Sequence, residues 1–329
     1  MKPESQPSQS PAADVLRVFH VVEITRYPDG TITCHDPCPC IPASSDPGDD
    51  STVLSRDVEI NQGLGTWARI YLPPTRVRHQ EKLPLLVYFH GGGFVCLSPS
   101  MVLNHSFCSG MAASLPAVVV SVGYRRAPEH RLPAAYDDAF EALRWIQTAE
   151  DEWLDKFADF TDCYLMGTSS GANIAYHAAL KVCKDETAGV NPKELKIKGL
   201  IMHSPFFGGL ERTESELRLF DDALIPVPAL DLFWEQSLPV GADRNHEYCS
   251  LKSVDRSAEW EKMKSLKWKV MVTGGEGDPL VDRQREVVAV LEGKGLEVVK
   301  LFGDGIHAAE LADSGKAQIL FEKIKSFMI

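Results

Sequence analysis

A serine between small residues is the first candidate for chemistry in this chain. Ser169 is the central residue of GTSSG (167–171), which follows an apolar run and precedes a segment of helical period. A sharp strand-to-helix turn needs small residues on both sides of the serine, and it projects the hydroxyl beyond the end of the strand. The backbone N–H of Ser170, at the start of the expected helix, would point to the same place. The pattern predicts a serine nucleophile with a hydrogen-bond donor beside it.

A base and an acid that orients it should accompany this serine, because a serine hydroxyl is otherwise a weak nucleophile. Asp278 and His307 each come just after an apolar run that we expect to be a strand. Glu276 and Asp282 stand near the same strand end as Asp278 and are rivals for the orienting role. The order serine, aspartate, histidine along the chain is that of the α/β hydrolases.

Three consecutive glycines end another expected strand. Gly91, Gly92 and Gly93 follow the apolar run in YFHGGGF (88–94). Backbone N–H groups at this position could stabilise the anion that forms when the serine attacks a carbonyl, by about 3 kcal/mol per donor. Side chains there would obstruct the approach of that oxygen. The glycines therefore predict an oxyanion hole, and we expect His90 to hold the loop by hydrogen bonding and not to transfer a proton.

Near-continuous apolar runs alternate with segments of helical period through most of the chain. Such runs are typical of strands buried on both faces of a parallel sheet, and the alternation predicts a doubly wound α/β sheet with right-handed crossovers. Alternating residues around turns predict antiparallel strands before it. The antiparallel strands are expected within 19–34 and 55–73, the later strands at 83–90, 117–124, 163–167, 197–205, 268–274 and 296–302, and the helices after Pro133, Gly171 and Asp282 and over 315–328.

The segment 206–245 interrupts this alternation because it contains no expected strand. An insertion of this length between sheet strands is commonly a lid or a binding loop. Ordinary helical packing on the sheet edge is the alternative. If the segment is a lid, its aromatic side chains are candidates for contact with a substrate: Phe206, Phe207, Phe233 and Trp234.

The composition restricts the class of protein. The 329 residues are 44% hydrophobic, which allows a large core, and we expect one domain over 1–329. The formal net charge is −12 with scattered basic residues, which argues against nucleic-acid binding. There is no secretory pattern at the N-terminus and no apolar run of about 18 residues that would span a membrane. With its cysteines spread through the chain, the sequence predicts a reduced, cytoplasmic protein.

Two N-terminal segments have an unusual composition. Residues 1–13 are rich in proline and serine, and we expect them to be frayed. The stretch CHDPCPC (34–40) contains three thiols and His35, but its spacing is not that of paired zinc ligands and no second ligand pair follows. We interpret it as an irregular loop and expect no metal site.

Five motifs occur in the order of a known family. HGGGF, GTSSG, DPLVD and IHAAE, together with YRRAPEHRLPAAYDDA, make the chain resemble the hormone-sensitive-lipase-like branch of the α/β hydrolases, and most closely the plant carboxylesterases. The resemblance covers about residues 15–329. It implies an α/β-hydrolase fold, a mostly parallel doubly wound sheet with an N-terminal and inserted helical lid, here at 1–50 and 206–245.

The resemblance also assigns roles to the residues of these motifs. It implies Ser169 as the nucleophile, His307 as the base and Asp278, the first aspartate of DPLVD, as the orienting acid. Many bacterial relatives have GDSAG where this chain has GTSSG, a change that should leave the backbone donor intact. The expected oxyanion hole comprises Gly92, Gly93 and Ser170 as donors, with Gly91 supporting the turn.

These assignments imply a carboxylic ester hydrolase that acts through an acyl-enzyme on small to medium apolar esters, without a metal or organic cofactor. Its partner would be a small-molecule ester, and the oligomeric state stays open, a monomer included. The same plant group contains gibberellin receptors, in which an aliphatic residue replaces the catalytic histidine, and 2-hydroxyisoflavanone dehydratases, which can have threonine at the nucleophile position. His307 argues against a non-catalytic gibberellin-binding module, and Ser169 argues for the esterase over the lyase.

Overall fold

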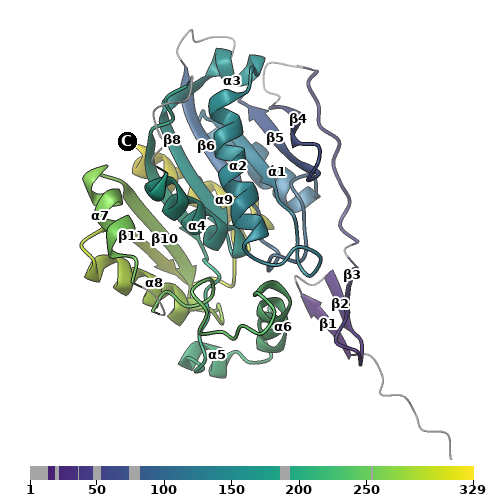
Figure 1. Ribbon diagram of the computed structural model, residues 1–329. Helices are drawn as coiled ribbons and strands as arrows, with labels where there is room; N and C mark the ends of the chain where they lie inside the picture. Colours follow the sequence, from purple (N-terminus) through teal and green to yellow (C-terminus); the bar gives the residue numbers. More distant parts are fainter. Residues whose placement is uncertain are drawn as a thin grey trace, which may run out of the picture.

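The structure is a computed structural model (Figure 1). It describes residues 14–18, 22–35, 37–46, 53–73, 82–185, 193–252 and 255–329. The expectation that residues 1–13 are frayed lies outside these ranges, as do parts of the expected N-terminal lid segment.

An eight-stranded sheet forms the centre of the protein. Its strands are β4 (Leu54–Asn61), β5 (Thr66–Leu72), β6 (Leu83–Phe89), β7 (Val118–Gly123), β8 (Ala158–Thr168), β9 (Ile197–His203), β10 (Lys269–Gly275) and β11 (Glu297–Gly303). The spatial order is β11-β10-β9-β8-β6-β7-β5-β4. Strands β6 to β11 pair in parallel, whereas β5 pairs antiparallel with β7 and with β4. This arrangement confirms the mostly parallel sheet with antiparallel strands at its entry.

Helices cover both faces of this sheet. The helices of the described residues are α1 (Val102–Ser114), α2 (Ala134–Thr148), α3 (Glu152–Phe157), α4 (Ser170–Lys184), α5 (Glu214–Arg218), α6 (Val227–Ser237), α7 (Ser257–Ser265), α8 (Val281–Gly293) and α9 (Ser314–Met328), with a short 3₁₀ helix η2 (Ala309–Leu311). Helices α1 and α9 pack together on one face, and α2, α4, α7 and α8 lie on the other (Figure 1). The four helices expected from the sequence, α2, α4, α8 and α9, are confirmed.

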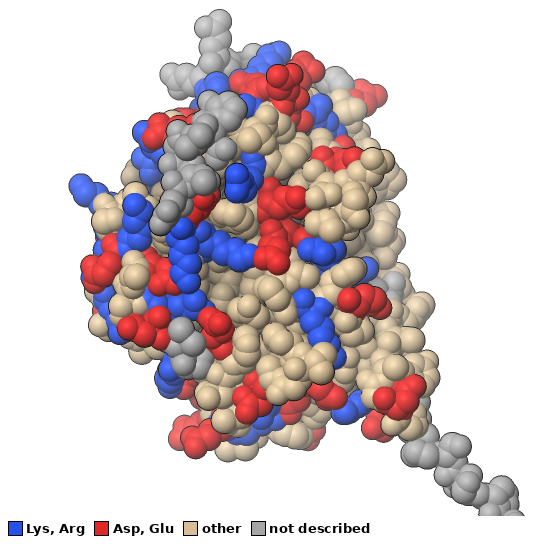
Figure 2. All heavy atoms as spheres, in the orientation of Figure 1, with Lys and Arg blue, Asp and Glu red and all other residues tan. Residues whose placement is uncertain are grey.

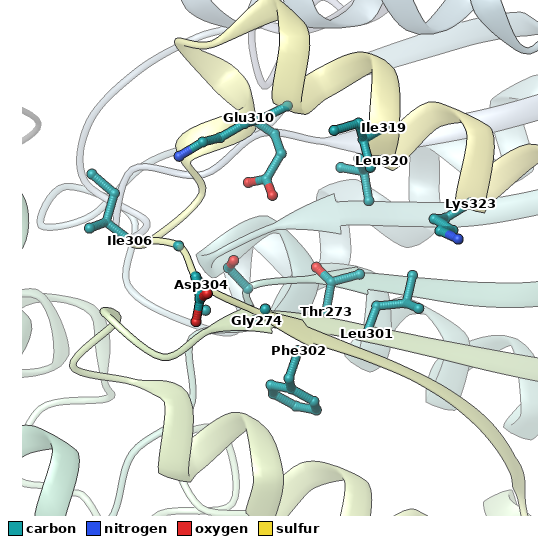
Figure 3. A pocket seen from close by; sticks show the side chains of 15 residues that line it. Thr273, Gly274, Leu301, Phe302, Asp304, Ile306, Glu310, Ile319, Leu320 and Lys323 are labelled. Carbon is teal, nitrogen blue, oxygen red and sulfur yellow. The ribbon is translucent and has the colours of Figure 1, made fainter.

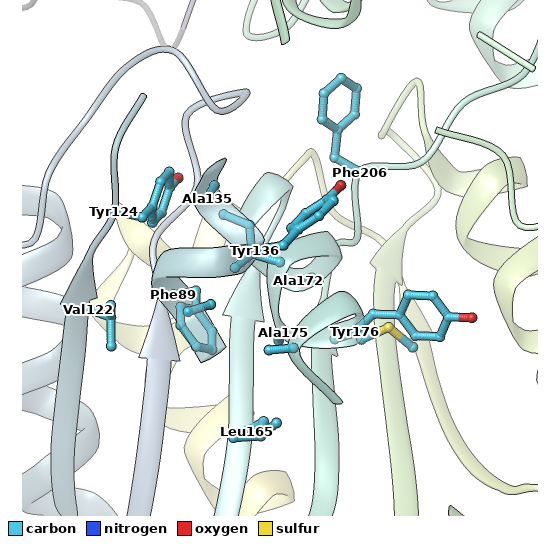
Figure 4. Packing of buried hydrophobic residues seen from close by; sticks show 14 of the residues in the cluster. Phe89, Val122, Tyr124, Ala135, Tyr136, Leu165, Ala172, Ala175, Tyr176 and Phe206 are labelled. Carbon is cyan, nitrogen blue, oxygen red and sulfur yellow. The ribbon is translucent and has the colours of Figure 1, made fainter. Parts of the chain in front are cut away.

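The sequences of the central strands are continuous apolar runs because both faces of the sheet are buried. In β7, Val118 and Val120 belong to the hydrophobic cluster on one side of the sheet and Val119 to the cluster on the other. Small residues allow the helices to approach closely. Figure 4 shows Ala172 and Ala175 of α4 above the sheet. The sheet and α4 thereby form a rigid base for the loops at the carboxyl ends of the strands.

Helix α1 was not expected from the sequence. Its residues do not divide into one apolar and one polar face, because the polar Asn104 is buried together with Phe107 and Met111. It also contains Gly110, which lowers helix propensity. A Cβ at Gly110 would lie 3.2 Å from the Phe321 ring of α9. The glycine therefore allows α1 and α9 to pack closely, a requirement that the periodicity of one segment does not reveal.

The described part of the N-terminal segment forms strands. β1 (Asp14–Val18), β2 (Val22–Arg26) and β3 (Ile32–His35) make a separate antiparallel sheet. β2 and β3 confirm the antiparallel strands expected within 19–34, and these described residues of the expected N-terminal lid segment contain no helix. Val22 and Ile24 alternate with more exposed residues and are buried, which is the pattern of a half-buried strand. The stretch CHDPCPC begins in β3, and so its first two residues are not part of an irregular loop.

The inserted segment 206–245 is helical, as expected, and its described residues contain α5 and α6 but no strand. The N-terminal sheet lies beside α6 (Figure 1), where Arg26 Nη2 pairs with Glu235 Oε1 at 2.9 Å. The two expected lid segments are therefore neighbours. Whether they act as a lid stays a prediction.

On the face drawn in Figure 2, acidic and basic side chains are interspersed. Within the described ranges, no helix is both long and apolar enough to cross a membrane, and no group of three or more potential ligands gathers to hold a metal ion.

Candidate active site

Ser169 occupies a strained turn between β8 and α4. Its backbone has φ 56° and ψ −121°, a conformation that a non-glycine residue adopts only when the surrounding structure enforces it. The flanking glycines are required by close backbone contacts. A Cβ at Gly167 would lie 2.0 Å from Gly171 O, and a Cβ at Gly171 would lie 2.0 Å from Phe89 O. The turn thus holds Ser169 at the carboxyl end of the sheet.

His307 joins Ser169 to Asp278. The Ser169 hydroxyl and His307 Nε2 are 2.9 Å apart, and His307 Nδ1 and Asp278 Oδ2 are 2.7 Å apart. With Nδ1 protonated, His307 donates to the carboxylate and accepts the hydroxyl proton at Nε2. All three side chains are buried. The structure brings the three residues expected from the sequence into one hydrogen-bonded chain.

The partners of Glu276, Asp278 and Asp282 show which of these acids can orient His307. Asp278 is fully buried, and its carboxylate also accepts hydrogen bonds from Leu280 N at 2.8 Å and Gln284 Nε2 at 2.6 Å. Asp282 accepts instead from Ser215 N in α5. Of the three acids, Asp278 is the one in contact with His307. The other rival, Glu276, forms an ion pair with Arg285.

The glycine turn has a conformation that its sequence explains. Gly92 has φ 108° and Gly93 φ 62°. Gly92 O accepts hydrogen bonds from Val95 N at 3.1 Å and Cys96 N at 2.9 Å, and a Cβ at Gly92 would lie 2.2 Å from Cys96 O. A Cβ at Gly91 would lie 3.2 Å from Ser169 Cβ. Two of the glycines therefore permit the turn, and Gly91 permits its close approach to the serine.

His90 supports this turn, as expected. Its Nδ1 lies 2.7 Å from Gly91 O, and its ring stacks on Tyr124 at 4.3 Å between centroids. The Tyr124 hydroxyl donates to His90 O at 2.9 Å. Burial lowers the pKa of His90 to about 3, so the imidazole is neutral at ordinary pH and is suited to donating from Nδ1.

A cavity of about 490 Å³ opens beside Ser169 and His307. Gly91 and Gly92 are part of its wall, whereas Gly93 and Ser170 are not. Most of the remaining wall is apolar. No pattern in the sequence identifies these side chains, because they come from separate loops and helices. They include Leu97, Val102, Leu103, Leu224, Ile306 and Leu311.

The four aromatic residues proposed to contact the substrate do not line this cavity. Phe206, Phe207, Phe233 and Trp234 are each at most 2% exposed. The rings of Phe206 and Trp234 stack at 4.5 Å, and a Cβ at Gly93 would lie 2.4 Å from Phe233 Cγ. These aromatic rings therefore pack in the core and behind the glycine turn. Burial in the core accounts for the apolar character of these four residues.

A second chain of hydrogen bonds runs beside the first. The Tyr88 hydroxyl donates to Thr168 Oγ1 at 2.9 Å, Thr168 Oγ1 lies 3.0 Å from His203 Nδ1, and His203 Nε2 lies 3.0 Å from Glu310 Oε2. Burial alone would raise the pKa of Glu310, but the hydrogen bond and the attraction of His203 outweigh it and lower that pKa to about 2. Sequence reasoning missed this chain, although Glu310 lies within the IHAAE motif.

Glu310 also lines a second cavity, of about 400 Å³, which is shown in Figure 3. Thr273, Leu301 and Leu320 contribute to its wall. Ile306 belongs to the walls of both cavities. The loop that carries His307 thus borders both cavities.

Comparison with known proteins identifies the family. A family model described as the alpha/beta hydrolase fold matches residues 86–311. Carboxylesterase 20 of Arabidopsis thaliana is 47% identical over 97% of this chain and 98% of that protein. A 3-O-acetylpapaveroxine carboxylesterase of Papaver somniferum is 40% identical over 91% of this chain and 95% of that protein. The protein belongs to the plant carboxylesterases of the α/β-hydrolase family, and it is an enzyme of that class.

Solved structures share the same architecture. An esterase of Pyrobaculum calidifontis superposes with a TM-score of 0.67 at 27% identity, over 83% of this chain and 85% of that one. A thermostable esterase of Pseudomonas putida has a TM-score of 0.69 at 20% identity, over 87% of this chain and 84% of that one, which shows the common fold alone.

Proposed function

We propose that Ser169, His307 and Asp278 hydrolyse carboxylic esters through an acyl-enzyme. The observation that carries this proposal is the hydrogen-bonded chain from the Ser169 hydroxyl through His307 to Asp278, with links of 2.9 Å and 2.7 Å, at the wall of a cavity. This chemistry needs a nucleophile, a base and an acid in contact, and these residues supply them in that order.

In the first half of the reaction, Ser169 Oγ attacks the acyl carbon while His307 Nε2 takes its proton. Asp278 stabilises the imidazolium that forms, and its own hydrogen bonds from Leu280 N and Gln284 Nε2 hold the carboxylate in its orientation. His307 then returns the proton to the leaving alcohol. Water then attacks the acyl-enzyme with the same proton transfers through His307, and the carboxylic acid is released.

The oxyanion is assigned to the backbone N–H groups of Gly92, Gly93 and Ser170. Within the described ranges, no hydrogen bond uses the N–H of Gly92 or Gly93, and Gly92 lines the cavity. Ser170 is the first residue of α4, and the first N–H groups of a helix have no partner within it. Gly91 contributes by its lack of a side chain beside Ser169.

The cavity favours small to medium apolar esters. It measures about 490 Å³, and Leu97, Val102 and Leu224 contribute apolar surface to it. The Papaver somniferum relative is named for an acetyl ester, which agrees with a short acyl group. A polar or highly charged substrate would have to leave water for an apolar wall, which is costly.

Hydrolysis of p-nitrophenyl esters of increasing acyl length tests this proposal. We expect turnover of the short esters, and we expect Ser169→Ala to lose at least about 10³-fold in kcat because the nucleophile is absent. Ser170→Ala is the matched control, since its backbone donor remains. Retention of activity by Ser169→Ala would contradict the mechanism.

The two alternative functions, a gibberellin receptor and a 2-hydroxyisoflavanone dehydratase, predict different results when the same purified protein is assayed. Saturable gibberellin binding without ester turnover, unaffected by His307→Ala, would favour a receptor. Conversion of a 2-hydroxyisoflavanone faster than any ester would favour a lyase. In the structure His307 contacts Ser169, a geometry that serves proton transfer from the hydroxyl and that hormone binding alone does not require.

A further inference from the structure

We propose that Cys34 and Cys96 form a disulfide that joins the N-terminal sheet to the glycine turn beside Ser169. Their Sγ atoms are 2.7 Å apart. Even carbon atoms without a bond between them stay about 3.5 to 4.0 Å apart, and sulfur is larger than carbon. A disulfide bond is about 2.05 Å long. The two thiols are therefore closer than ordinary packing allows and need only a small movement to bond.

The two residues come from parts of the chain that have different tasks. Cys34 lies on β3 and is exposed, whereas Cys96 is buried in the turn that follows the three glycines. Cys96 N donates to Gly92 O at 2.9 Å, so Cys96 closes the turn that carries the expected oxyanion donors. A bond between these sulfurs would cross-link two segments that are 62 residues apart in the chain.

Four other cysteines are less suited than Cys34 to react with a disulfide reagent. Burial raises the pKa of Cys108 and of Cys183 to about 12, and it also raises the pKa of Cys163 and Cys249. A thiol must ionise to attack a disulfide, so none of these four is expected to make the first attack on a reagent at neutral pH. Exposed Cys34, in contrast, is accessible to a reagent in solution.

The oxidant that we propose is a low-molecular-weight disulfide such as glutathione disulfide. The Cys34 thiolate attacks one sulfur of the reagent, a mixed disulfide forms, and one thiolate leaves. The Cys96 thiolate then attacks the Cys34 sulfur, and the second thiolate leaves. The two thiol protons pass to the two leaving thiolates, so one protein disulfide and two small thiols are formed from two protein thiols and one reagent disulfide.

The cross-link would join two walls of the catalytic cavity. Leu97, next to Cys96, lines that cavity, and so does Cys38, four residues after Cys34. A bond between the cysteines holds these walls at a fixed separation. The modification is independent of ester hydrolysis, because it requires only the two thiols and the oxidant.

Peptide mapping of the full chain tests the proposal. The reduced protein is incubated with glutathione disulfide, remaining thiols are alkylated in denaturant, and the digest is analysed without reduction. We expect the number of alkylated thiols to fall by two and a peptide that links Cys34 to Cys96 to appear. A complete set of alkylated thiols, a stable glutathione adduct at Cys34, or a link from Cys34 to Cys38 or Cys40 would overturn the proposal.

Two exposed cysteines of the same segment provide matched variants. Cys40→Ser should keep the link, whereas Cys34→Ser should lose it. Because a cross-link between distant residues restricts the unfolded chain, oxidation should raise the melting temperature of wild type and Cys40→Ser by several degrees and leave Cys34→Ser unchanged. A lower melting temperature of the linked protein would show that the bond strains the native positions, and it would overturn the proposal.

Discussion

His203 Nε2 lies 3.0 Å from Glu310 Oε2, and this contact ties β9 to the loop that follows His307. The other nitrogen of His203 lies 3.0 Å from Oγ1 of Thr168, the residue before Ser169. The two chains of hydrogen bonds thus run from adjacent hydroxyl residues of β8 and its turn to residues of one short loop. The second chain has no direct contact with the Ser169 hydroxyl, but it holds Thr168, the residue before Ser169, and Glu310, three residues after His307.

The first prediction concerns Glu310. In Glu310→Gln the contact with His203 loses its charge, and we expect kcat to fall by about tenfold, or ~1.4 kcal/mol, with KM nearly unchanged. Steady-state kinetics on a short ester measure the effect, with Glu297→Gln on β11, where Glu297 is exposed, as the control. Equal kcat in Glu310→Gln and wild type would show that the second chain does not position His307.

Glu310 also predicts an effect of acid. Its pKa is lowered from the ordinary 4.5 to about 2 in the folded protein, so its contribution to stability is complete above pH 4.5 and is lost as the pH falls toward 2. Wild type should therefore lose more unfolding free energy between pH 4.5 and 3 than Glu310→Gln. Urea unfolding at both pH values measures the difference. Parallel pH dependence of the two proteins would contradict the lowered pKa.

The second prediction separates the acidic residues near β10. Asp278→Asn should lower kcat by about 10⁴-fold, since the amide cannot stabilise the imidazolium and favours the wrong tautomer of His307. Asp282→Asn is the matched control, because Asp282 bonds to Ser215 N and not to His307. We expect its kcat to stay within about threefold of wild type. A larger loss in Asp282→Asn than in Asp278→Asn would reverse the assignment.

The third prediction distinguishes the glycines of the turn. A methyl group at Gly92 would meet Cys96 O at 2.2 Å, and the backbone there has φ 108°, so Gly92→Ala should lose both activity and stability. In Gly91→Ala the methyl group would lie 3.2 Å from Ser169 Cβ, and we expect a loss of kcat with a change in stability below about 1 kcal/mol. Kinetics and thermal unfolding of both variants provide the test. Unchanged kcat in Gly91→Ala would show that this side of Ser169 is not used.

The fourth prediction concerns buried histidines. Burial lowers the pKa of His90 to about 3 and that of His177 well below its ordinary value. The stability that depends on their neutral form is complete above about pH 6.5 and is lost as the pH falls, because the unfolded chain then binds protons that the folded protein excludes. His177→Gln should reduce the loss of unfolding free energy between pH 6 and pH 5, because the variant lacks this titrating group. Denaturant unfolding at both pH values checks this, and an unchanged slope in the variant would contradict it.

The sequence was most informative where local geometry restricts residue type. Ser169 was predictable because Gly167 and Gly171 have no room for a Cβ, and strands such as β7 were predictable because both of their faces are buried. The spacing alone left three acids open. The family resemblance selected Asp278, and its contact with His307 distinguishes it from Glu276 and Asp282 on physical grounds.

The features that were missed depend on contacts between distant segments. The aromatic residues of 206–245 have the composition of a binding surface, but Phe206 and Trp234 are buried in the core. The pairing of His203 with Glu310 joins residues 107 positions apart, and neither residue type reveals the other. The N-terminal strands were visible in the alternation around β2, whereas their position beside α6 follows from tertiary packing.

The most direct test of the central claim is covalent labelling with an organophosphate, followed by intact-mass measurement and peptide mapping. A nucleophilic serine attacks the phosphorus atom of such a reagent as it attacks the acyl carbon of an ester, and the adduct that forms is stable. We predict one adduct per chain, located on Ser169, with labelling strongly slowed in His307→Ala and abolished in Ser169→Ala. An adduct on any other residue, or labelling that persists in Ser169→Ala, would contradict the account.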